Sequence, residues 1–167
     1  MSKKIAFMGT PSISGQILKS LYQNGFNIEI VYTQPPVTSN RGYKLNKSPV
    51  HIMAEILNIP VRTPIKLDNP EEKQFLKNKN IDLGIVVAYG QILKKDILDL
   101  PKYGWINIHY SLLPKLRGAA PIQRAIMNNE NLTGISIILI EFSPHPISRL
   151  SYFTGVLTGI FNISAII

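Results

Sequence analysis

The stretch at residues 81–90, IDLGIVVAYG, decides the fold class of this chain. Between Leu83 and Ala88 it has no charged or polar side chain, and Ile and Val dominate it. A strand that is apolar on both faces is typical of a parallel sheet covered by helices on both sides. We therefore expect residues 81–90 to hold a central strand of an α/β sheet.

Segments typical of strands and helices alternate on both sides of this run. Ile13, Ile17, Leu18 and Leu21 recur at helical spacing, and that pattern stops at Asn24 and Gly25. The alternation predicts an open, mostly parallel α/β sheet with right-handed crossovers. The other expected strands lie in residues 3–10, 27–33, 59–64 and 105–109, and the expected helices in residues 13–25, 49–58, 69–80 and 120–130.

Composition limits the partners and the cellular compartment that we expect for the protein. The 167 residues include 18 Lys and Arg against 10 Asp and Glu, a formal charge of +8. Such a balance favours polyanionic partners such as nucleic acid, although a merely soluble basic protein has it too. There is no cysteine, which excludes disulfides and thiolate zinc sites and fits a reducing compartment. The first apolar run is four residues long, whereas a secretory signal needs roughly 7–15.

Two polar side chains, Asn107 and His109, stand at the end of the expected strand WINIH. Residues i and i+2 of a strand point to the same face, roughly 6.5–7 Å apart. An amide can donate to a developing oxyanion, and an imidazole can donate or transfer a proton. Ligands of parallel α/β sheets bind at the carboxyl ends of strands, so this pair is a candidate site. A pair that only satisfies backbone groups has the same pattern.

Two neighbouring segments are expected to form turns. After the pair, Ser111 and Pro114 are expected to fix a turn, and residues 118–120 to allow close backbone approach before a helix that begins near Pro121. Near the N-terminus, residues 8–15 (MGTPSISG) resemble the first βα turn of nucleotide-binding sheets. They lack both G-x-G-x-x-G and the P-loop lysine, so a structural turn is favoured.

One region interrupts the alternation. Residues 33–50, TQPPVTSNRGYKLNKSPV, form an 18-residue polar stretch that includes Arg41, Lys44 and Lys47. A loop of this length within a compact domain is usually functional or disordered. We therefore expect it to be exposed.

Several motifs together carry a resemblance to a known family. They are GTP at residues 9–11, TQP at 33–35, RGYKL at 41–45, SPV at 48–50, VVAYGQIL at 86–93, NIHYSLLPKLRGAAPIQRAI at 107–126 and TG at 133–134. Over residues 3–140 the chain resembles the methionyl-tRNA formyltransferase family. The resemblance implies a Rossmann-like catalytic domain, with helices on both sheet faces, at residues 1–140. It also implies formyl transfer from 10-formyltetrahydrofolate to methionine on initiator tRNA in translation initiation, by a cytoplasmic monomer without a metal or a membrane partner.

The resemblance also assigns roles to individual residues. It makes Asn107 and His109 two members of a catalytic Asn-His-Asp set. It implies that a segment contacts the folate, and the residues of that segment are Ser111, Leu112, Leu113 and Pro114. It also implies that a loop reaches the acceptor stem of the tRNA, and this loop includes Arg41, Gly42 and Lys44.

The resemblance stops near residue 140. There the family continues to Leu-Asp-x-Gly-Asp, whose first Asp completes the catalytic set, but here that position falls near His145 and no Asp follows Asp99. Residues 141–167 contain only Glu141 and Arg149 as charged residues and show no clear periodicity. We expect these residues to form an atypical tail, with the C-terminal tRNA-binding domain absent and the sheet incomplete. Out-of-frame translation is the favoured explanation, ahead of a genuine short homologue and a membrane segment at residues 150–167.

Three functions therefore remain open. The first is formyl transfer to the initiator tRNA, with little activity expected from the chain as written. The second is formyl transfer to a small amine, such as a glycinamide ribonucleotide or a sugar amine, for which a long basic loop has no evident use. The third is a non-catalytic remnant that binds folate or tRNA, which folate binding without formyl transfer would indicate.

Overall fold

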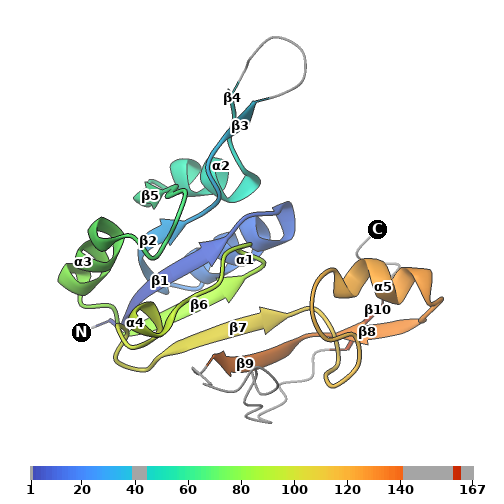
Figure 1. Ribbon diagram of the computed structural model, residues 1–167. Helices are drawn as coiled ribbons and strands as arrows, with labels where there is room; N and C mark the ends of the chain where they lie inside the picture. Colours follow the sequence, from blue (N-terminus) through green and yellow to red (C-terminus); the bar gives the residue numbers. More distant parts are fainter. Residues whose placement is uncertain (1, 39–44, 141–159, 163–167) are drawn as a thin grey trace.

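The computed structural model describes residues 2–38, 45–140 and 160–162. Its centre is a six-stranded sheet in the order β5-β2-β1-β6-β7-β9 (Figure 1). Neighbouring strands are parallel except β9, which runs antiparallel to β7. The strands are β1 (Lys4–Gly9), β2 (Asn27–Tyr32), β5 (Val61–Arg62), β6 (Leu83–Val87), β7 (Trp105–His109) and β9 (Ser136–Ile140). The expected mostly parallel α/β sheet is confirmed.

Helices cover both faces of the sheet, as expected. Alternate residues of β1 divide between two buried clusters: Ile5 and Phe7 pack with α1, α2 and α5, whereas Ala6 and Met8 pack with α3 and α4. Residues i and i+1 of a strand point to opposite faces, so the two clusters are the two halves of the core. The helices are α1 (Ser12–Gln23), α2 (Pro49–Ile56), α3 (Pro70–Lys79), α4 (Lys95–Leu98) and α5 (Pro121–Met127).

The central position of β6 depends on close packing at Gly84. β6 lies between β1 and β7 and is buried from Gly84 to Val87. A Cβ at Gly84 would lie 1.9 Å from the ring of Trp105, which is fully buried and donates from Nε1 to the Ile97 carbonyl at 3.0 Å. The glycine therefore provides the space that the indole occupies.

The expectation of one exposed loop at residues 33–50 is wrong at both ends. Thr33 is fully buried, and its hydroxyl lies 2.7 Å from that of Ser48, which caps α2 by accepting from the His51 amide at 3.0 Å. Val50 is fully buried within α2. Between these ends lie two short, exposed, paired strands, β3 (Val37–Thr38) and β4 (Leu45–Asn46). Arg41, Gly42 and Lys44 lie outside the described residues.

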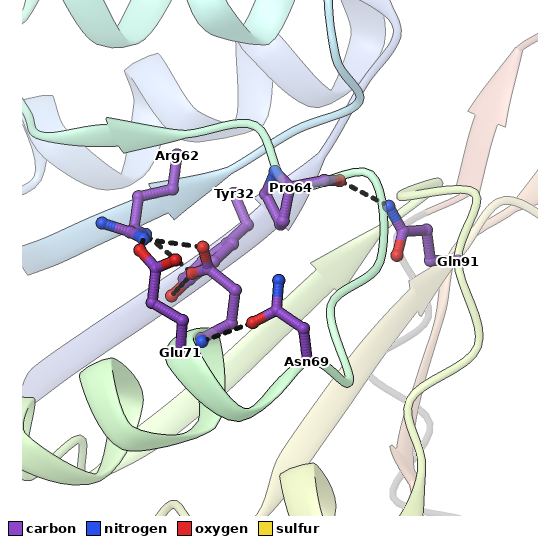
Figure 2. Close-up of polar contacts among 7 residues, drawn as sticks. Tyr32, Arg62, Pro64, Asn69, Glu71 and Gln91 are labelled. Carbon is purple, nitrogen blue, oxygen red and sulfur yellow. Dashed lines mark hydrogen bonds and ion pairs between the residues drawn. The ribbon is translucent and has the colours of Figure 1, made fainter.

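A partly buried ion pair joins β5 to α3 (Figure 2). Arg62 donates to Glu72 through Nε and Nη2, both at 2.7 Å, and Nη2 also donates to Glu71 at 2.8 Å. The Tyr32 hydroxyl donates to Glu72 at 3.0 Å. Asn69 caps α3 by accepting from the Glu72 amide at 2.7 Å. The two acids in the first turn of α3 thus fasten the helix to the sheet.

Part of the tail takes regular structure. β10 (Ile160–Asn162) pairs antiparallel with β8 (Leu132–Gly134). No helix among the described residues is long and apolar enough to cross a membrane. The rest of residues 141–167, including His145, lies outside the described residues.

Candidate active site

Asn107 is the middle residue of β7 and His109 is its last residue, and both line one pocket. The pocket has a volume of about 140 Å³ and is also lined by Leu113, Arg117, Gly118 and Ile138. Strand alternation places both side chains on the same face, as expected from their spacing. The structure therefore brings the two candidate catalytic residues together.

The hydrogen bonds of the pair leave groups open to a ligand. His109 Nε2 lies 3.1 Å from the carbonyl oxygen of Leu116. A carbonyl can only accept, so Nε2 carries the proton and Nδ1 is left to accept when the ring is neutral or to donate when it is protonated. Among the described residues, the Asn107 side chain has no hydrogen-bond partner. The pocket thus presents an amide and one ring nitrogen.

The segment after β7 is fastened by two serines. Ser111 is fully buried and donates to the Lys115 carbonyl at 2.8 Å. Ser136 of β9 donates to the Ser111 carbonyl at 2.8 Å and accepts from the Leu113 amide at 3.2 Å. The expected turn is confirmed, and it includes a cis peptide bond before Pro114. Within residues 111–114, Leu113 is the residue that lines the pocket, whereas the Ser111 hydroxyl is used inside the turn.

The loop that carries Leu116 has an unusual backbone. Leu116, Gly118 and Ala120 have φ values of 55°, 88° and 56°, in the left-handed region. A Cβ at Gly118 would meet no described atom of the chain within 4 Å, so the positive φ, and not close packing within the protein, is what favours glycine there. This conformation turns the Leu116 carbonyl towards His109. Strain at a polar pocket is a common feature of functional sites.

Two pocket residues were not singled out from the sequence. Arg117 adds a positive charge to the pocket and follows the expected turn by three residues. Ile138 reaches the pocket because β9 pairs antiparallel with β7, which places Ile138 opposite Asn107. The run around Ile138 is apolar, but its pairing partner has no local signal. Of the two residues, Arg117 therefore had a sign in the sequence, a basic side chain near a candidate site, whereas Ile138 had none.

The first βα turn is structural, as favoured from the sequence. A Cβ at Gly9 would lie 2.8 Å from Ser14 Cβ and 3.0 Å from the Val87 carbonyl. Ser14 is buried and donates to that carbonyl at 2.7 Å. The close approach of β1, α1 and β6 explains the glycine without a bound phosphate.

The fold and the pocket together define a Rossmann-like α/β protein with a polar site at the carboxyl ends of its strands. The formyl transferase family model matches residues 3–142, and the chain belongs to that family. Methionyl-tRNA formyltransferase from Pelagibacter ubique (strain HTCC1062) is 61% identical over 141 residues, which cover 84% of this chain and 46% of that protein. Methionyl-tRNA formyltransferase from Caulobacter vibrioides (strain NA1000 / CB15N) is 49% identical over 135 residues, 81% of this chain and 44% of that protein.

Solved structures give the same fold. Phosphoribosylglycinamide formyltransferase from Bacillus halodurans superposes with a TM-score of 0.69 over 96% of this chain and 80% of its own, at 22% identity. That likeness shows the fold alone. The chain spans about half the length of the methionyl-tRNA formyltransferases that it matches.

Proposed function

We propose that residues 1–140 form the catalytic domain of a methionyl-tRNA formyltransferase, which transfers a formyl group from 10-formyltetrahydrofolate to the amino group of methionine on initiator tRNA. The observation that carries the proposal is the Asn107–His109 pair, which shares one pocket and has open hydrogen-bonding groups. The identity to relatives with that name supports the choice of substrates. Such an enzyme acts in the cytoplasm, and we propose that the chain is a monomer.

The proposed reaction begins with attack of the methionine nitrogen on the formyl carbon. The new C–N bond pushes negative charge onto the formyl oxygen, to which the Asn107 amide and a protonated His109 can donate. Collapse of the intermediate breaks the bond to the folate nitrogen N10, and the proton lost from the attacking amine ends on N10. His109 donates to the oxygen from Nδ1, because Nε2 is held by Leu116. A carboxylate, which the family supplies as an Asp, would take the proton from the attacking amine and pass it to N10.

A carboxylate is also needed to orient the imidazole and keep it charged. In the family this carboxylate is an Asp, and the corresponding position of this chain falls near His145. Imidazole is neutral or cationic, so His145 cannot act as the anion. We therefore expect the chain as written to transfer formyl roughly 10²–10⁴-fold more slowly than a version with that Asp.

Binding of the two substrates is assigned on different grounds. For the folate we propose residues 111–114, with Leu113 in the pocket and Ser111 acting by holding the turn. For the tRNA we propose the loop that contains Arg41, Gly42 and Lys44, which the charge of +8 supports. Metal chemistry has no role in this scheme.

The proposal is tested by a formyl-transfer assay on purified protein. The assay compares the chain as written with a version restored to the downstream family sequence, and it offers each of them methionyl-tRNA, a glycinamide ribonucleotide and a sugar amine in turn. The restored version is expected to formylate methionyl-tRNA. Transfer to a small amine alone would favour the second candidate function, which shares this fold. Folate binding without any transfer by the restored version would indicate a binding protein.

A further inference from the structure

The turn that follows β6 lies where the strand order of the sheet reverses. β1 continues to β2 on one side, whereas β6 continues to β7 on the other. Gly9 pairs with Val87 and Val86 pairs with Asn107, so the chain leaves β6 between the end of β1 and the candidate catalytic pair. Ligands of open α/β sheets bind in the crevice at this point.

The turn has a backbone that needs support. Ala88 and Gly90 have φ values of 48° and 90°, both in the left-handed region. An alanine disfavours that region because its Cβ crowds the following carbonyl. Both residues are exposed, while the side chain of Tyr89 between them is buried in the core shared with α3 and α4.

Two side chains from other strand ends hold the Tyr89 carbonyl. Thr10, which follows β1, donates from Oγ1 at 2.8 Å, and Gln34, which lies beyond β2, donates from Nε2 at 3.1 Å. These two bonds use both lone pairs of the oxygen. The carbonyl is therefore held at a single orientation.

A third side chain ties the turn to the segment after β5. The Gln91 amide donates to the Pro64 carbonyl at 3.0 Å (Figure 2) and accepts from the Leu67 amide at 2.9 Å. The turn is thus connected to the ends of β1, β2 and β5. Gly90 is exposed, and among the described residues its backbone amide has no hydrogen-bond partner, so it is available as a donor.

We propose that Thr10 and Gln34 are positioning residues, which fix the turn at residues 88–91 through the Tyr89 carbonyl and thereby preorganise the crevice for its ligand. Neither residue needs to touch the ligand. A fixed turn presents the Gly90 amide to an acceptor group without an ordering step, whereas a mobile turn is competent to bind for only part of the time. The inference rests on the proposed function only for the choice of ligand.

The test uses the whole chain and the double variant T10V/Q34L, which removes both donors and keeps similar side-chain volumes. NMR order parameters of the amides at residues 88–91 should be near 0.85 in the unsubstituted chain and below about 0.6 in the variant. The Kd for 5-formyltetrahydrofolate, a stable relative of the donor, should rise about tenfold if the competent fraction falls to about a tenth. T10S keeps the hydroxyl and should restore both values in the Gln34-containing chain.

Q74L is the matched control, because Gln74 is an exposed glutamine whose amide donates to Asn78 on α3. It should change neither readout. Unchanged order parameters in T10V/Q34L, or a mobile turn with unchanged affinity, would overturn the inference. The single variants Q34L and T10V report the same quantities if the double variant does not fold. Failure of the unsubstituted chain to bind the folate would instead count against the proposed function, and the order parameters alone would then decide whether these side chains fix the turn.

Discussion

The Arg62–Glu72–Tyr32 cluster joins the sheet to α3, whereas the Asn107–His109 pair lies on β7, and the two polar groups differ in how fully their hydrogen bonds are made. Both Glu72 carboxylate oxygens accept bonds from Arg62, and one also accepts from Tyr32. In the pocket, one ring nitrogen of His109 is bonded, and the Asn107 side chain has no partner among the described residues. A polar group whose bonds are all made holds structure, whereas one with open bonds can bind a ligand.

Protonation behaviour follows the same division. The pKa of Tyr32 is raised because the hydroxyl is buried and because the Glu72 carboxylate lies beside it. The pKa of Arg62 is raised by its hydrogen bonds to Glu72. Both groups therefore keep their protons throughout the accessible pH range. This cluster is suited to a fixed structural role.

The largest effect on stability is expected from Glu72→Ala. It leaves the buried Tyr32 hydroxyl without its acceptor and the partly buried Arg62 with Glu71 alone, so the free energy of unfolding should fall by about 3 kcal/mol. Urea denaturation measures this. Glu71→Ala is the control: its side chain is 79% exposed, and an exposed pair contributes about 0–1 kcal/mol. Similar losses in both variants would show that the burial of Glu72 is unimportant.

Asn107→Ala should reverse this pattern. In the restored version of the protein, kcat for formyl transfer should fall roughly 10²–10³-fold, because a donor to the developing oxyanion is lost. Unfolding free energy should change by less than about 0.5 kcal/mol, since no bond within the described chain is broken. Steady-state kinetics and denaturation together make the measurement. A large loss of stability with normal kcat would place Asn107 with the structural cluster.

Ser136→Ala is expected to have an intermediate effect. Ser136 is buried, and its loss leaves the Ser111 carbonyl and the Leu113 amide without their partner, which should cost about 1–3 kcal/mol. Affinity for 5-formyltetrahydrofolate should fall as well, because Leu113 lines the pocket. Binding and denaturation are compared with those of Ser20→Ala on the exposed part of α1. An unchanged affinity would separate the turn from the pocket.

The smallest effect is expected from surface ion pairs in acid. The Lys94 ammonium lowers the pKa of Asp68, and the Lys73 ammonium lowers that of Asp96. A carboxyl whose folded pKa lies below its unfolded value adds stability above the unfolded pKa, near 3.9, and loses it as pH falls through the folded value. Denaturation at stepped pH should therefore show a slight decline below about pH 4. The double variant D68N/D96N should have a shallower decline, and an equal slope would show that other carboxyls are responsible.

Local pattern was enough to determine several features of the molecule. The apolar run of β6 identified a central strand, because a segment without a polar face must be covered on both sides. The spacing of Asn107 and His109 placed them on one face, because strand alternation depends only on backbone geometry. The motifs of residues 107–126 identified the family, which the match over residues 3–142 confirms.

Other features were decided only by the tertiary structure. Ile138 enters the pocket through the register of β9 on β7, and Leu116 meets His109 through a left-handed loop. Thr33 is buried with its hydroxyl against that of Ser48, although both belong to a stretch that is polar in sequence. The physical reason is common to all three. Periodicity reports which face a residue occupies, whereas pairing between distant segments depends on register and packing that no local pattern records.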